Sequence, residues 1–126
     1  MEQWSDNFKA PEKLHTASKN VRIIATAFYI PQLKRKRTVS IYLPDNYSKT
    51  KNRFPVLYLH DGQNVFDDAR SYAGEWGVDE FLDTTKLKNC IVVAVDNGSV
   101  KRMNEYNPYD HTNFGKGEGA AYIDFL

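Results

Sequence analysis

The sequence predicts an α/β fold built around a strand, a helix and a second strand that form a parallel βαβ unit. Two continuous apolar runs, residues 54–59 and 90–95, each stop at a polar turn. Runs of this kind are typical of strands buried on both faces of a sheet. Between them, residues 76–85 repeat apolar side chains at helical spacing. A strand, a helix and a strand in this order form a right-handed βαβ unit in nearly all proteins.

An antiparallel pair of strands is expected before this unit. Residues 21–30 are rich in β-branched and aromatic side chains, which favour a strand. Residues 38–43 alternate between apolar and polar side chains, which is typical of a half-buried antiparallel strand. The basic run at 34–37 lies between them, and we interpret it as a solvated hairpin turn rather than a nucleic-acid patch. Residues 1–20 are polar and are expected to form an irregular lead-in to one domain, residues 21–126.

The remaining elements follow from local patterns. Residues 99–116 are rich in Asn, Tyr and Pro, which predicts a long loop without structure of its own. Residues 117–126 favour the opening turns of a helix. Trp76 is expected in the core. The helix face that is expected to pack on the sheet consists of Val78, Phe81, Leu82 and Thr85.

Composition argues against several function classes. The formal net charge of +1 gives no electrostatic reason for binding nucleic acid or membranes. No apolar run is long enough for a transmembrane helix, and residues 1–14 lack the apolar stretch of a secretory signal. Cys90 is the one cysteine, which excludes an intrachain disulfide framework and fits a reducing compartment. We therefore expect a cytoplasmic location.

Polar residues follow each apolar run, at the end of the strand where parallel sheets bind ligands. His60 and Asp61 follow the first run, and Asp96 follows the second. We interpret His60 as a packed, hydrogen-bonded structural residue rather than a base. The acidic residues near it lack the fixed spacing of a hard-cation site, so no metal is expected.

Five segments resemble esterases of the enterochelin esterase and esterase D type, which are α/β-hydrolases. These segments are YLPDNY, FPVLYLHDGQNVFD, GEWGVDE, IVVAVDNG and RMNEYNPY. They occur in the order and spacing of the family, and the resemblance extends from about residue 21 to residue 126. It implies a carboxylic ester hydrolase with a Ser-His-Asp triad, a small-molecule ester substrate and no metal or organic cofactor. It also implies that the sheet is the front part of an α/β-hydrolase sheet.

The nucleophile motif of this family, G-x-S-x-G, is absent from the sequence. In α/β-hydrolases the acid and the histidine of the triad follow the nucleophile along the chain. We therefore expect the triad beyond residue 126, so that the chain is a fragment that is inactive alone. The strand at 54–59 would then be an open sheet edge, which favours self-association.

The resemblance also assigns an oxyanion donor. In α/β-hydrolases one backbone N–H of the oxyanion hole comes from the loop after the third strand of the family sheet. By resemblance, this loop is the one that follows residues 54–59. We predict the amide of Gln63 for this role and that of Gly62 as second choice, because glycine accepts positive φ and lets a substrate approach closely. A tight turn that merely requires glycine is the open alternative for Gly62.

Three side chains are predicted to bind substrate because, by resemblance, their loops border the cleft. Asn64 belongs to the loop after the first apolar run, and Arg102 and Tyr106 belong to the long loop after the second. An Arg102–Glu105 ion pair that stiffens the long loop is an equally open interpretation.

Two other function classes stay open. A non-catalytic α/β module could bind a carbohydrate or a protein partner with the same loops, and it would be favoured if the gene continued without a serine elbow. A hydrolase that uses two carboxylates would need a pair facing one cleft, and the sequence does not place such a pair.

Overall fold

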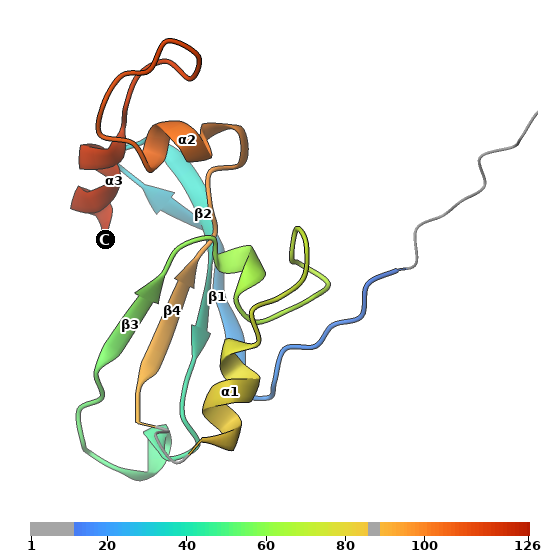
Figure 1. Cartoon of the computed structure of the whole chain (residues 1–126). Coiled ribbons are helices and arrows are strands. Elements are labelled where there is room, and N and C mark those ends of the chain that lie inside the picture. Colours follow the sequence, from blue (N-terminus) through green and yellow to red (C-terminus); the bar gives the residue numbers. More distant parts are fainter. Residues whose placement is uncertain (1–11, 86–88) are drawn as a thin grey trace, which may run out of the picture.

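A four-stranded mixed sheet organises the chain, of which the computed structural model describes residues 12–85 and 89–126. The strands lie in the order β1-β2-β4-β3; the β1–β2 and β2–β4 pairs are antiparallel, and the β4–β3 pair is parallel (Figure 1). The strands are β1 (Val21–Ile30), β2 (Arg35–Tyr42), β3 (Val56–Leu59) and β4 (Ile91–Val95). The helices are α1 (Val78–Thr84), α2 (Arg102–Glu105) and α3 (Gly119–Phe125), with 3₁₀ turns η1 (Tyr47–Lys49), η2 (Gly62–Asn64) and η3 (Ser99–Lys101). The predicted α/β fold, with an antiparallel pair followed by a parallel βαβ unit, is confirmed.

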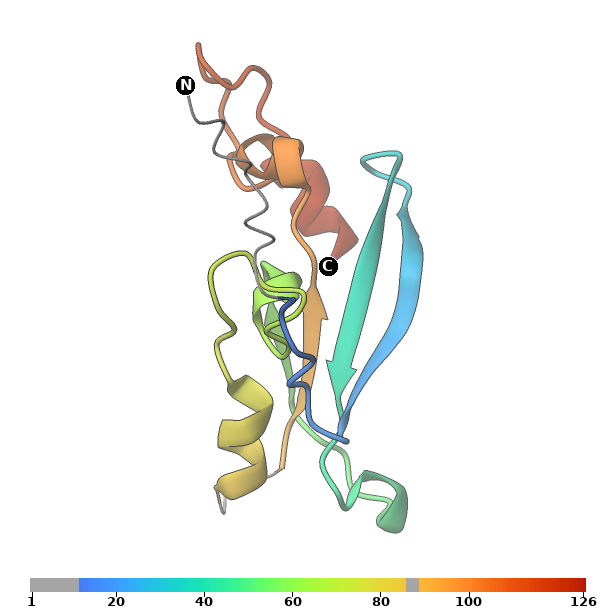
Figure 2. The same cartoon turned by 90° about the vertical axis from the view of Figure 1, so that its right-hand side faces the viewer.

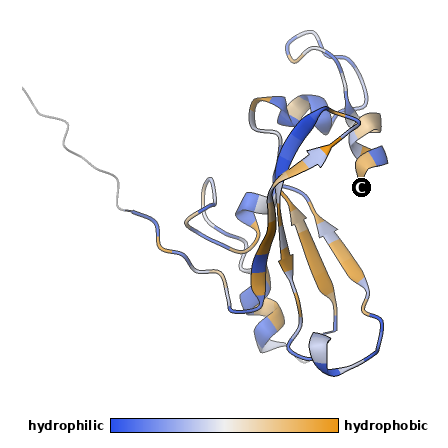
Figure 3. Ribbon diagram, turned by 180° about the vertical axis from the view of Figure 1, so that it is seen from behind, coloured by the Kyte–Doolittle hydropathy of each residue, from blue (hydrophilic) through white to orange (hydrophobic). Residues whose placement is uncertain are grey.

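The strand at 54–59 is not buried on both faces, and this part of the prediction is wrong. β3 pairs only with β4, so it forms the edge of the described sheet. Val56, Leu57 and Tyr58 are 44%, 48% and 51% exposed. Helix α1 covers one face of the sheet, while the apolar stretches of β3 and β4 stay open on the other (Figures 2 and 3). The expected open edge is therefore present.

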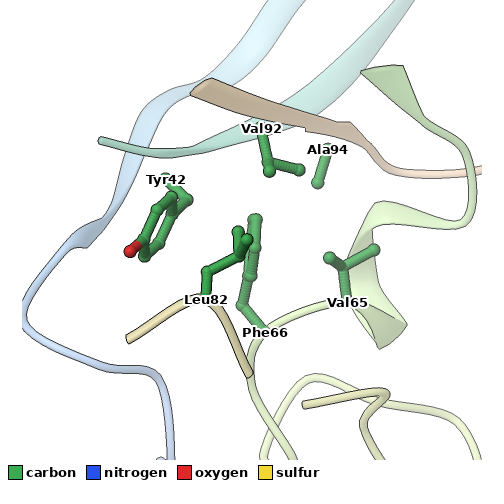
Figure 4. Packing of buried hydrophobic residues seen from close by; sticks show 6 residues of the cluster. All are labelled: Tyr42, Val65, Phe66, Leu82, Val92 and Ala94. Carbon is green, nitrogen blue, oxygen red and sulfur yellow. The ribbon is translucent and has the colours of Figure 1, made fainter. Parts of the chain in front are cut away.

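The core lies between the sheet, α1 and the loop after η2. It consists of Tyr42, Val65, Phe66, Leu82, Val92 and Ala94 (Figure 4). Each of the larger side chains contributes about 1.5–3 kcal/mol to stability by leaving water. On β2 this core is reached by Tyr42, whose hydroxyl donates a hydrogen bond to Asp83 at 2.9 Å. The face of β2 that carries Tyr42, which the alternation of the sequence marks as the polar face, therefore packs against α1.

The helix packs differently from the prediction. Leu82 is buried and Val78 packs against the core cluster, as expected. Phe81 is 63% exposed and Trp76 53% exposed, so the expectation that both lie in the core is wrong. Asp79 is fully buried instead. Because α1 has only seven residues, few of its side chains can reach the sheet.

The basic run is not a solvated turn, and this interpretation is wrong for Arg35 and Arg37. Both lie in β2, in the hydrophilic stretch beside α2 in Figure 3. Arg37 is buried and pairs with Glu105, which is 0% exposed. Arg35 Nη1 lies 2.9 Å from Glu105 Oε1 and 2.6 Å from Glu118 Oε2. The acidic partners lie 68 to 83 residues away along the chain, where no local pattern could reveal them.

Residues 99–116 have structure of their own, contrary to the prediction of a plain loop. They form η3, α2 and an isolated bridge between His111 and Gly115. The Asn104 side chain is buried and donates hydrogen bonds to the carbonyl oxygens of Phe114, at 2.6 Å, and Lys116, at 2.9 Å. The predicted helix after this segment is confirmed as α3.

The lead-in prediction falls mostly on residues 1–11, which lie outside the described residues. The part that follows runs over the loop after η2 and over α1. His15 Nδ1 lies 2.8 Å from Asp67 Oδ2, and the Ser18 N–H donates to Asp79 Oδ2 at 2.7 Å. In the described part of the chain, no helix has the length and apolar character needed to cross a membrane.

Candidate active-site cleft

A cavity of about 530 Å³ opens at the carboxyl ends of β3 and β4. This is the edge at which parallel sheets carry their ligand sites. Its lining residues are Asp61, Gln63, Asn64, Tyr72, Asn97, Ser99 and Arg102. The structure thus brings Gln63, Asn64 and Arg102 together, as the sequence predicted. Gly62 and Tyr106, which were also predicted for the site, are not among the lining residues of this cavity.

The loop after β3 turns sharply, as predicted, and the turn depends on Asp61. This residue adopts the left-handed conformation, with φ 54° and ψ 44°. Aspartate tolerates this region better than most residues. The Asn64 N–H then donates to the Asp61 carbonyl oxygen at 2.8 Å, which closes η2. The strand end is thereby folded into a tight turn.

Gly62 is a glycine for a reason other than the predicted one. Its φ is not positive, so conformational freedom is not what the position requires. A Cβ atom at this position would lie 2.6 Å from the carbonyl carbon of Val95 and 2.8 Å from that of Ala94. The turn therefore lies directly on the backbone of β4, and only glycine allows this contact. Its role as an oxyanion donor stays a prediction.

The backbone amide of Gln63 lies in the short turn η2. Among residues 12–85 and 89–126, no group accepts a hydrogen bond from this N–H, so it is not used in the sheet. The Gln63 side chain faces the neighbouring strand end, where its Oε1 accepts a hydrogen bond from the Asn97 N–H at 3.1 Å. The side chain thus fixes the turn, while the amide stays available to a ligand.

Asp61 and Arg102 form a two-pronged ion pair across the cleft. Arg102 Nε and Nη2 lie 2.8 Å from Asp61 Oδ1 and Oδ2, respectively. Asn97 Nδ2 donates to the same carboxylate at 2.8 Å. The hydrogen bonds from Arg102 are the main reason why the pKa of Asp61 lies below its usual value. The alternative pairing of Arg102 with Glu105 is wrong, because Glu105 pairs with arginines of β2.

Tyr106 supports this ion pair from behind. The Arg102 guanidinium lies 5.0 Å from the centre of the Tyr106 ring, in cation–π geometry. The Tyr106 hydroxyl accepts a hydrogen bond from the Asp61 N–H at 3.2 Å. Burial raises the pKa of this hydroxyl, so it stays protonated. Tyr106 lines a second, more apolar cavity of about 350 Å³ and does not line the first.

His60 stands in that second cavity. Its ring packs on Tyr106 and Tyr122, with ring centres 5.4 and 5.5 Å apart. Its Nδ1 lies 3.0 Å from the Tyr122 hydroxyl. His60 is packed and hydrogen-bonded, as predicted. Its side chain nevertheless remains exposed in the cavity that it shares with residues of α3.

Sequence reasoning missed part of the cleft. Asn97 was not predicted, although it follows β4 just as Asp61 follows β3, and this symmetry was the available signal. Tyr72 reaches the cavity because its N–H donates to Asn64 Oδ1 at 2.8 Å, which no local pattern indicates. Ser99 also lines the cavity, with φ 53°, but no described histidine shares that lining. The cleft holds hydrogen-bond donors and one neutralised ion pair.

The mixed sheet, with a polar cleft at the carboxyl ends of β3 and β4, agrees with the front part of an α/β-hydrolase-like sheet. Residues 30–126 match the model of the family described as "Putative esterase", so the chain belongs to that family. The predicted resemblance is confirmed.

Three proteins are similar to it. Uncharacterized protein YjcH of Bacillus subtilis (strain 168) is 31% identical over 93 residues, which cover 73% of this chain and 37% of YjcH. The structure of an IroE-like serine hydrolase from Shewanella oneidensis matches with a TM-score of 0.56 and 23% identity, over 89% of this chain and 35% of that one. The BES protein from Bacillus cereus matches with a TM-score of 0.64 and 16% identity, over 90% and 45%. The chain spans less than half the length of each relative.

Proposed function

We propose that these 126 residues are the N-terminal part of a serine-dependent carboxylic ester hydrolase that acts on small-molecule esters. The observation that carries the proposal is the free Gln63 amide beside a polar cavity, in a chain of an esterase family. Acyl transfer develops negative charge on the carbonyl oxygen, and a backbone N–H aimed at it is a strong stabiliser. A cytoplasmic location remains part of this proposal.

Each cleft residue then has a role. The Gln63 N–H is the oxyanion donor that this part of the protein supplies, with Gly62 as second choice. The Asp61–Arg102 pair holds the turn in place, because it ties the end of β3 to α2. Asn64 and Arg102 contact the polar portion of the substrate, and Tyr106 keeps the Arg102 side chain in position.

The nucleophile is not supplied by these residues, because the sequence has no G-x-S-x-G. The 126-residue chain should therefore not hydrolyse a p-nitrophenyl ester above a buffer control. A longer protein that continues past Leu126 into a serine elbow should do so. If that longer protein shows no hydrolysis, the esterase proposal is wrong, and the alternative of a non-catalytic binding module gains support.

The oxyanion role can be tested in the longer protein by removing one N–H. Gln63→Pro deletes the amide hydrogen, and Gln63→Ala keeps it while removing the same side chain. We expect the proline variant to lose about 10²–10³-fold in kcat relative to the alanine variant, with little change in KM. Proline also restricts Gly62, so the melting temperature of both variants must be compared. Equal kcat values in two folded variants would refute the role.

We also propose that the chain by itself associates through the edge of β3. Its unpaired backbone groups are flanked by half-exposed Val56, Leu57 and Tyr58. Such an edge is a template for another strand. In the longer protein, this edge is the place where a further strand would pair.

A further inference from the structure

Three carboxylates meet at the beginning of α1, away from the residues that line the cleft. Glu75 approaches from the preceding loop, and Asp79 and Glu80 lie in the first turn of the helix. Gly77, with φ 64°, makes the bend that brings them together. One oxygen from each carboxylate lies within 4.8 Å of those from the other two.

Two oxygen atoms of this cluster are buried and accept no hydrogen bond from any described residue. Asp79 is 0% exposed, and its Oδ1 has no hydrogen-bond donor. Glu75 Oε2 is also buried without a donor. Leaving such atoms unsatisfied is costly, and the cost is larger for charged groups. The cluster therefore offers buried carboxylate oxygens to a ligand that supplies positive charge.

No side chain of the described residues supplies that charge. The other oxygen of the Asp79 carboxylate, Oδ2, accepts a hydrogen bond from the Ser18 N–H at 2.7 Å. Within residues 12–85 and 89–126, no Lys, Arg or His forms an ion pair with Glu75, Asp79 or Glu80. The like charges repel one another in a partly buried place, where screening by water is weak.

We propose that Glu75, Asp79 and Glu80 form a Ca²⁺ site. Calcium binds carboxylate oxygens at about 2.3–2.6 Å, so two oxygens on one ion lie at most about 5 Å apart. The three carboxylate oxygens all lie within 4.8 Å of one another, which is compatible with this range. Magnesium, at about 2.0–2.1 Å, would require the oxygens to approach within about 4.2 Å and to take octahedral geometry. Glu80 is exposed, which leaves one side open for water ligands.

The ion would join α1 to the loop that precedes it, and this loop contacts the segment after η2. The Trp76 N–H donates to the Asn64 carbonyl oxygen at 2.8 Å, and the Val78 N–H to that of Val65 at 3.3 Å. Trp76 directly follows Glu75, and Val78 directly precedes Asp79. Calcium binding should therefore stabilise the loop behind Asn64, in addition to holding α1 to the segment that contains Ser18.

The test is metal binding by the 126-residue chain, which requires no enzymatic activity. Trp76 directly follows Glu75, so Tb³⁺ in a calcium site should show luminescence on tryptophan excitation that Ca²⁺ displaces. Trp76→Phe should remove most of this signal. In parallel, CaCl₂ should raise the melting temperature saturably, and MgCl₂ should do so only at much higher concentration.

Substitutions of the three carboxylates test whether they bind the ion. Glu75→Gln and Asp79→Asn should each weaken Ca²⁺ affinity by about 10-fold or more, in line with the sensitivity of metal sites to altered ligation. Asp124→Asn, at an exposed position of α3, is the matched control and should bind like the unchanged chain. If Asp79→Asn does not fold, Glu75→Gln and Glu80→Gln give the answer. The site is refuted if the unchanged chain shows no saturable response to Ca²⁺, or if Glu75→Gln responds like Asp124→Asn.

Discussion

Replacing Glu105 by glutamine tests whether the buried ion network holds the two ends of the structure together. Glu105 lies in α2 with no exposed surface, and it pairs with Arg35 and Arg37 of β2. The substitution keeps the size of the side chain but removes the charge. Arg37 is only 8% exposed, and it then loses the negative charge that offsets the free-energy cost of burying its own positive charge.

The magnitude follows from the geometry. Removing one partner of a buried ion pair costs about 3–5 kcal/mol, because the other charge stays buried. We expect the lower end, about 3 kcal/mol, because Arg35 keeps Glu118. That is a large part of the 5–15 kcal/mol typical of a small domain. With a urea slope of about 1.5 kcal/mol per molar, the midpoint should fall by about 2 M.

The assay is urea unfolding followed by circular dichroism, with Glu118→Gln as the control. Glu118 and Arg35 keep 24% and 22% of their side-chain surface exposed, so that pair is worth at most about 1 kcal/mol. A midpoint for Glu105→Gln within about 0.5 M of that for Glu118→Gln would refute the reasoning, since it would mean that Arg37 is compensated in another way.

Three further outcomes are expected. The pKa of Asp61 is lowered in the folded state by Arg102, so its stabilising effect is present above its unfolded pKa and is lost as the pH falls through the folded value. The difference in urea midpoint between the unchanged chain and Asp61→Asn should therefore shrink between pH 7 and pH 3, and a constant difference would contradict this. Gly62→Ala should destabilise the chain by about 1–3 kcal/mol in the same assay, because its Cβ meets the backbone of β4, whereas an unchanged midpoint would show that the turn can move away. Tyr58→Lys should shift the mass measured by light scattering toward the monomer, since a charge on the edge strand disfavours pairing, and equal masses for both chains would remove β3 from the interface.

Local patterns in the sequence determined the elements and the family. Apolar runs predicted β3 and β4, and helical spacing predicted α1 between them, because side-chain periodicity reports which face of an element is buried. The polar ends of both strands located the cleft, since parallel strands end at the same edge of a sheet. The turn at Gly62 and Gln63 was placed for the same reason.

Tertiary structure alone decided the partners and the degree of burial. Asp61 meets Arg102 across 41 positions, and Arg37 meets Glu105 across 68. The pairing partner of a charged residue depends on which elements become neighbours, and periodicity within one element carries no information about this. The same reason explains why β3 lies at an exposed edge and why Asp79 is buried among carboxylates, although each lies in an element that the sequence itself predicted.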